Sequence, residues 1–117
     1  MASGREMFGA FIRRERIARE IGLREMAKMI GVSPTYLSKV ERDEFTPPTE
    51  EKVRAIARII ECDPDHLLAM AGRVSSDVTD IIKRQPTELS ALLRTASGLT
   101  AEDIVRLAQE VKKVKGE

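Results

Sequence analysis

The sequence LREMAKMIGVSPTYLSKVER, at residues 23–42, has the pattern of two short helices joined by a tight turn. Ala27 is expected to be small because the second of these helices crosses directly over it. Gly31 stands where the chain leaves the first helix, and we expect a positive φ there, which glycine adopts at little cost. Ser33 should cap the second helix, with Pro34 at the first helical position, where a missing N–H does no harm.

Five apolar residues are expected to form the wedge between the two helices: Met26, Ile30, Val32, Leu37 and Val40. The outer face of the second helix then carries four polar residues: Thr35, Tyr36, Ser38 and Lys39. An ordinary helical hairpin without a ligand is the alternative, but it does not require the small residue, the glycine, the cap and the wedge together. A helix presented in this way fits the major groove of duplex DNA, which is about 12 Å wide. The pattern therefore predicts that residues 34–41 bind DNA.

Helical spacing of apolar residues continues on both sides of this motif, and no run alternates as a strand would. A first helix is expected to begin after Ser3 and to turn five apolar residues inward: Met7, Phe8, Phe11, Ile12 and Ile17. Gly22 should cap the helix over 23–30, with Glu25 as half of a capping box. Two further helices are expected after Thr49 and Asp63, and Gly72 closes the domain. We expect a five-helix domain over residues 1–72.

The segment over residues 73–117 is also expected to be helical, with starts at Ser76, Pro86 and Thr100. Two of its helices carry inward stripes, formed by Leu89, Leu92, Leu93 and Ala96 and by Ile104, Leu107, Ala108, Val111 and Val114. The first domain looks complete without these stripes. They are therefore expected either to fold back on residues 1–72 or to pair with a second copy, and we favour a homodimer through 73–117. The predicted fold class is all-α.

Composition limits the class of protein further. The single cysteine, Cys62, cannot form an internal disulfide, and no stretch approaches the roughly 18 apolar residues that span a bilayer. The segment Met1–Glu6 lacks the apolar region of a signal peptide. We therefore expect a cytoplasmic protein without a membrane partner. The formal net charge is only +1, so a prediction of DNA binding depends on where the basic residues point.

Over residues 7–72 the chain resembles the Cro/CI-type (Xre family) helix-turn-helix regulators, which have the lambda-repressor-like fold. The resemblance is carried by Phe8-Gly9, Ile12-Arg13, Arg16, Ile21, residues 23–42, the Pro-Pro loop and Ile56-Ala57. It implies five helices. It also implies that Arg16 and Glu41 pair and tie the first helix to the end of the third. This pair would have a structural role, as Ala27 and Gly31 do in the turn. Two solvated charges are the alternative. The chain departs from the family at Gly22, where Ser or Thr is common, and so lacks a cap side chain for phosphate.

The motif and the resemblance give each exposed polar residue an expected role on double-stranded DNA. Thr35 and Ser38 can bond base edges, and Lys39 can reach either guanine or a phosphate. Tyr36 can bond a phosphate or be half-buried under the following loop. Ser33 and Pro34 belong to the same surface. Four more cations are phosphate candidates: Arg13, Arg24, Lys28 and Arg42.

The predicted function is that of a sequence-specific transcriptional regulator, a dimeric repressor or autoregulator. One alternative is an antitoxin-like module that binds DNA and neutralises, or is cleaved by, an unknown partner; another is a purely structural adaptor. An enzyme is not expected, since the chain has one histidine and no nucleophile–base set. No cofactor is expected either, and Cys62 with His66 offers too few ligands for a metal.

Overall fold

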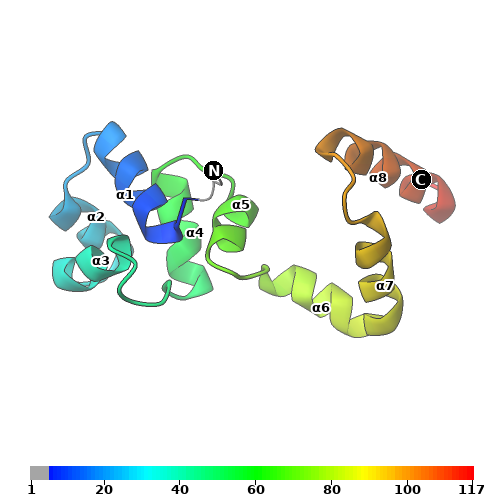
Figure 1. The fold of residues 1–117 in the computed structure, drawn as a ribbon, viewed down its shortest axis with the longest axis horizontal. Coiled ribbons are helices and arrows are strands. Elements are labelled where there is room, and N and C mark those ends of the chain that lie inside the picture. Colours follow the sequence, from blue (N-terminus) through cyan, green and yellow to red (C-terminus); the bar gives the residue numbers. More distant parts are fainter. Residues whose placement is uncertain (1–5) are drawn as a thin grey trace. The chain divides into compact units, whose positions relative to one another are not determined.

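The computed structural model describes residues 6–117 and has eight helices and no strand in this range, which confirms the all-α prediction (Figure 1). The chain divides into two compact units, residues 1–76 and 77–117. The helices of the first unit are α1 (Phe8–Ala18), α2 (Leu23–Ile30), α3 (Pro34–Glu41), α4 (Glu50–Ile59) and α5 (Pro64–Met70). After them come α6 (Ser76–Arg84), α7 (Pro86–Ala96) and α8 (Ala101–Lys115).

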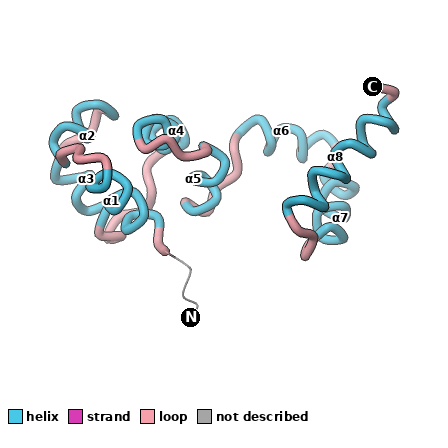
Figure 2. The backbone as a smooth tube through the Cα atoms, turned by 90° about the horizontal axis from the view of Figure 1, so that it is seen from above, coloured by secondary structure: helices cyan, strands magenta, loops and turns pink. Residues whose placement is uncertain are grey.

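The first unit is built around α3 and α4. Helix α3 packs against both α1 and α2, while α4 packs against α5 and α2. The buried core consists of Phe8, Ile12, Met26, Ala27, Ile30, Leu37, Val40, Val53, Ile56, Ala57, Ile60, Leu67 and Leu68. Every one of the five helices contributes to this core, and short loops join them (Figure 2). The unit therefore has a closed apolar interior of its own.

The helices begin where the side-chain caps were expected. The Oγ of Ser33 accepts a hydrogen bond from the N–H of Tyr36 at 3.0 Å, and Thr49 caps α4 through the N–H of Lys52. Asp63 accepts from the N–H of Asp65 at 2.8 Å at the start of α5. Each cap satisfies an N–H that the helix itself leaves without a partner.

The first helix differs from the prediction. It begins at Phe8 rather than after Ser3, which lies outside the described residues. Met7 and Ile17 were expected inside, but their side chains are 63% and 49% exposed. The buried residues of α1 are Phe8, Gly9, Ile12 and the charged Arg16. The apolar pattern misplaced the buried face because a charged residue occupies part of it.

The first unit extends past Gly72 because hydrogen bonds from Arg73 and Ser76 hold the next residues to it. Arg73 donates from Nη2 to the carbonyl oxygen of Pro47 at 2.8 Å and from Nη1 to that of Pro48. The N–H of Ser76 donates to Glu50 at 3.3 Å. This unit therefore ends four residues later than the expected domain boundary.

The second unit consists of helices whose described residues are nowhere buried. The leucines of α7 were expected to face inward, yet Leu92 and Leu93 are 48% and 58% exposed. Thr100 and Asp103 form the capping box expected at the start of α8. Among the described residues, no helix is both long and apolar enough to cross a membrane.

Candidate nucleic-acid interface

Helices α2 and α3 meet at a turn whose geometry depends on two small residues. Ala27 has no exposed surface, and Gly31 has a φ of 76°, in the left-handed region that favours glycine. The Nζ of Lys52 donates to the carbonyl oxygen of Ile30 at 2.8 Å and so closes the end of α2. The turn therefore fixes α3 against α2, as the sequence pattern predicts.

The outer face of α3 carries Thr35, Ser38, Lys39 and Arg42. Ser38 and Lys39 stand three and four residues after Thr35, and Arg42, which caps the end of α3, stands four and three residues after them, so the four share one side of the helix. Thr35 and Arg42 are exposed, whereas Ser38 and Lys39 are half-buried. Ser33 is exposed and Pro34 is half-buried at the N-terminal end of the same helix.

The basic residues expected to contact phosphate lie on three elements around α3. A cleft of about 900 Å³ is lined by Arg13 of α1, Ser38 and Arg42. Arg24 and Lys28 are exposed and stand four residues apart on α2, hence on one face. Arg42 forms an ion pair with Glu44 at 3.0 Å. The cleft brings two of the expected cations to the side of a half-buried hydroxyl on α3.

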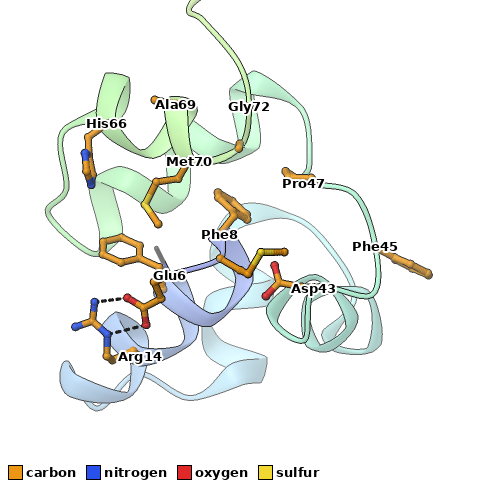
Figure 3. Close-up of a pocket in the computed structure, with 13 residues that line it drawn as sticks. Glu6, Phe8, Arg14, Asp43, Phe45, Pro47, His66, Ala69, Met70 and Gly72 are labelled. Carbon is orange, nitrogen blue, oxygen red and sulfur yellow. Dashed lines mark hydrogen bonds and ion pairs between the residues drawn. The ribbon is translucent and has the colours of Figure 1, made fainter. Parts of the chain in front are cut away.

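The loop after α3 adds an aromatic residue that the sequence analysis missed. The ring of Phe45 lies 5.8 Å from that of Tyr36, centroid to centroid, and the Nζ of Lys39 lies 5.2 Å from its centroid. Tyr36 is half-buried in this contact, as one of its two expected roles required. Phe45 also lies at the edge of a pocket lined by Phe8, Phe11 and Met70 (Figure 3). A lone aromatic in a polar loop was the signal that could have identified it.

Asp43 joins the end of α3 to the start of α1, another contact that the sequence analysis missed. Its carboxylate accepts hydrogen bonds from the N–H groups of Gly9 and Ala10 at 2.8 and 3.2 Å. A Cβ at Gly9 would lie 2.2 Å from the carbonyl oxygen of Val40, so only glycine fits at this approach. Figure 3 shows Asp43 facing the start of α1 beside Phe8. The orientation of α1 is thereby fixed to that of α3.

Arg16 and Glu41 form a second tie between α1 and α3. Arg16 donates from Nε and Nη2 to the two carboxylate oxygens of Glu41, at 2.8 and 2.9 Å, and from Nη1 to the carbonyl oxygen of Ile21 at 2.8 Å. The hydrogen bonds to Glu41 raise the pKa of Arg16 above its ordinary value. The two side chains are only 10% and 3% exposed, so the pair is buried between α1 and α3.

The residues considered for a metal site have other contacts. The ring of His66 packs edge-on against that of Phe11, with centroids 6.1 Å apart. Burial raises the pKa of the Cys62 thiol, and the negative charge of Asp63 adds to this effect. Within residues 6–117 no group of three or more potential ligands comes together.

Comparison with known proteins relates this geometry to a family. The helix-turn-helix family model matches residues 12–67. The chain is 36% identical over 63 residues to repressor protein C2 of Salmonella phage P22, covering 54% of this chain and 29% of the repressor. It is 31% identical over 75 residues to an uncharacterised helix-turn-helix-type transcriptional regulator of Mycobacterium tuberculosis, covering 64% of this chain and 53% of that protein.

The solution structure of the DNA-binding domain of the P22 c2 repressor is also similar. The sequence identity is 34% and the TM-score 0.50, over 56% of this chain and 84% of that domain. The chain spans less than two thirds of the length of both curated relatives. Their names give no support to an antitoxin-like module over a regulator. The matched model and these identities show that residues 12–67 form a helix-turn-helix domain of the Cro/CI (Xre) type.

Proposed function

We propose that this chain is a sequence-specific, duplex-DNA-binding transcriptional regulator that acts in the cytoplasm as a dimeric repressor or autoregulator, not as an enzyme. The outer face of α3 carries this proposal, because Thr35, Ser38 and Lys39 lie on a helix held rigidly by α1 and α2. An α-helix with its side chains is about 10–12 Å wide, which matches a major groove of about 12 Å.

The relatives support the same function. One is named a repressor, and the domain matched in its solved structure is described as DNA-binding. Both relatives are longer than this chain, so repression by the chain itself is part of the proposal.

Each group on the interface has a proposed task. Thr35 and Ser38 contact base edges, with Ser33 and Pro34 at the end of α3 that enters the groove. Arg13, Arg24, Lys28 and Arg42 bind phosphates, and Arg42 exchanges its exposed pairing with Glu44 for one of them. Phosphate contacts position the domain, and base contacts select the sequence.

Dimerisation is proposed to occur through residues 73–117. Large apolar side chains on α7 and α8 are exposed, including Leu92, Leu93, Ile104 and Val111. Large apolar side chains that a chain leaves exposed in this number often mark an interaction site. A symmetric dimer would place two α3 helices on half-sites one DNA turn apart, about 34–36 Å.

Selection of bound sequences from random duplex DNA tests the function directly. We expect a palindromic site with half-sites one turn apart. Thr35→Ala should change the preference at one base pair, while Thr87→Ala, at another exposed threonine, on α7, should leave the selected site unchanged. Failure to enrich any sequence, with affinity no better than the roughly 10⁻⁴–10⁻⁶ M of non-specific binding, would refute the proposal.

A further inference from the structure

Phe45 is the one phenylalanine or tyrosine of the described chain that is exposed. Phe8 belongs to the core, and Phe11 and Tyr36 pack against it. Phe45 is 45% exposed, on the loop between α3 and α4. Burial therefore does not account for a large apolar ring at this position. The ring lies instead beside α3, the proposed DNA-reading helix (Figure 3).

The ring has two partners, and both are on α3. Tyr36 lies against it at 5.8 Å with an angle of 45° between the ring planes. The ammonium of Lys39 lies 5.2 Å from the ring centroid. The face of an aromatic ring is negative and attracts a cation at this distance. Phe45 thus contacts the charged end of the long Lys39 side chain.

The loop that carries Phe45 is itself fixed on both sides of the ring. Asp43 is hydrogen-bonded to the N–H groups of Gly9 and Ala10. On the other side, Arg73 binds the carbonyl oxygens of Pro47 and Pro48. The ring is therefore anchored to the same framework as α3.

We propose that Phe45 is a positioning residue for the DNA contact of Lys39, an inference that rests on the function proposed above. The ring covers one side of the ammonium and leaves its remaining N–H donors for a phosphate or a guanine. Because the ring already holds Lys39 in the free protein, less side-chain freedom is lost on binding. Phe45 acts through Lys39 and needs no DNA contact of its own.

A double-mutant cycle on the full chain tests this role, with titration of each variant on the duplex selected by the wild type. Phe45→Leu should weaken binding about two- to fivefold, the size of an exposed cation–π contact. Phe45→Tyr keeps the ring face and should bind as the wild type does. In a Lys39→Met background, Phe45→Leu should have no further effect, because the ring then has no cation to hold. Thermal melting checks that all variants are folded.

Three outcomes would overturn the inference. Phe45→Leu could bind the duplex as tightly as the wild type, or Phe45→Tyr could bind as weakly as Phe45→Leu. Phe45→Leu could also lower the affinity equally with and without Lys39. The last of these would mean that Phe45 only stabilises the loop or contacts DNA itself. A wild-type chain that selects no duplex would overturn the proposed function as well. Specific binding by the wild type together with an uncoupled Phe45 would refute this inference alone.

Discussion

Arg16 lies on the buried side of α1 because each of the three nitrogens of its guanidinium has an acceptor there. Two carboxylate oxygens of Glu41 and the carbonyl oxygen of Ile21 receive its hydrogen bonds. A buried ion is costly without a partner, but a fully bonded pair offsets most of that cost. The pair therefore joins α1 to α3 at a position where sequence alone would call for an apolar residue.

Removal of one partner should destabilise the domain strongly. Arg16→Met or Glu41→Gln should each cost about 3–5 kcal/mol, because the other group stays buried without its bonds. The double variant should cost less than the sum of the two. Chemical denaturation of the three variants measures these free energies of unfolding.

The exposed pair of Arg14 and Glu6 provides the control for that experiment. The side chains of this pair are 55% and 34% exposed, so Arg14→Met should leave the free energy of unfolding nearly unchanged. If the substitutions at Arg16 and Glu41 lower the free energy of unfolding by equally small, additive amounts, their pairing contributes nothing to stability.

How far the sequence predicts the structure depends on how local each signal is. Cap residues act on N–H groups only two or three positions further along the chain. The helix starts expected from Ser33, Thr49 and Asp63 are accordingly confirmed. Gly31 has the positive φ expected. For the interface, spacing on α3 predicted which side chains share its outer face, although their contacts with DNA stay predictions.

The features that sequence reasoning missed join residues far apart in the chain. Asp43 meets Gly9 across 34 positions, and Arg73 meets Pro47 across 26. No periodicity or cap motif encodes such a pairing, because it exists only after the helices have packed. The role of Phe45 was missed for the same reason, since it follows from where the loop lies over α3.

The junction of α1 and α3 depends on the close approach at Gly9. Alanine favours a helix over glycine by about 1 kcal/mol, but a Cβ here would overlap the carbonyl oxygens of Val40 and Glu41. We expect Gly9→Ala to lower the free energy of unfolding by about 1–3 kcal/mol. Gly22→Ser is the control, because nothing lies closer than 4.0 Å to a Cβ at Gly22. A Gly9→Ala protein as stable as the wild type would contradict this account.

The loop between α3 and α4 depends on Arg73. Arg73→Met leaves the carbonyl oxygens of Pro47 and Pro48 without their charged donor, which should cost about 1.5–3 kcal/mol. Affinity for the selected duplex should fall as well, because the loop also carries Phe45. Arg58→Met, an exposed arginine on α4, should change neither quantity. Full affinity in a destabilised Arg73→Met protein would show that loop rigidity is irrelevant to binding.

At the scale of the whole molecule, the first unit has a closed core and the second does not. We expect the full chain to be a dimer and Leu92→Glu/Leu107→Glu to be a monomer, since charges within an apolar contact are strongly unfavourable. Affinity for a palindromic duplex should fall greatly, because each monomer then covers one half-site. Light scattering and DNA titration measure the two effects.

A matched variant places the same charges elsewhere on the same helices. Thr87 and Gln109 fall on the sides of α7 and α8 opposite the apolar stripes, by helical spacing. Thr87→Glu/Gln109→Glu should therefore stay dimeric. The proposed interface is ruled out if the wild-type chain is monomeric at micromolar concentration, or if the two double variants behave alike.

The contact of Asp43 with the start of α1 has a consequence for the ionic conditions of binding. A helix N-terminus is a natural anion site, and here the protein fills it with its own carboxylate. A DNA phosphate would have to displace that internal anion to reach the same amides. Backbone contacts must then come mainly from long cationic side chains, whose pairing with phosphate releases condensed counterions. The affinity for DNA should accordingly depend on the salt concentration as strongly as on the base sequence.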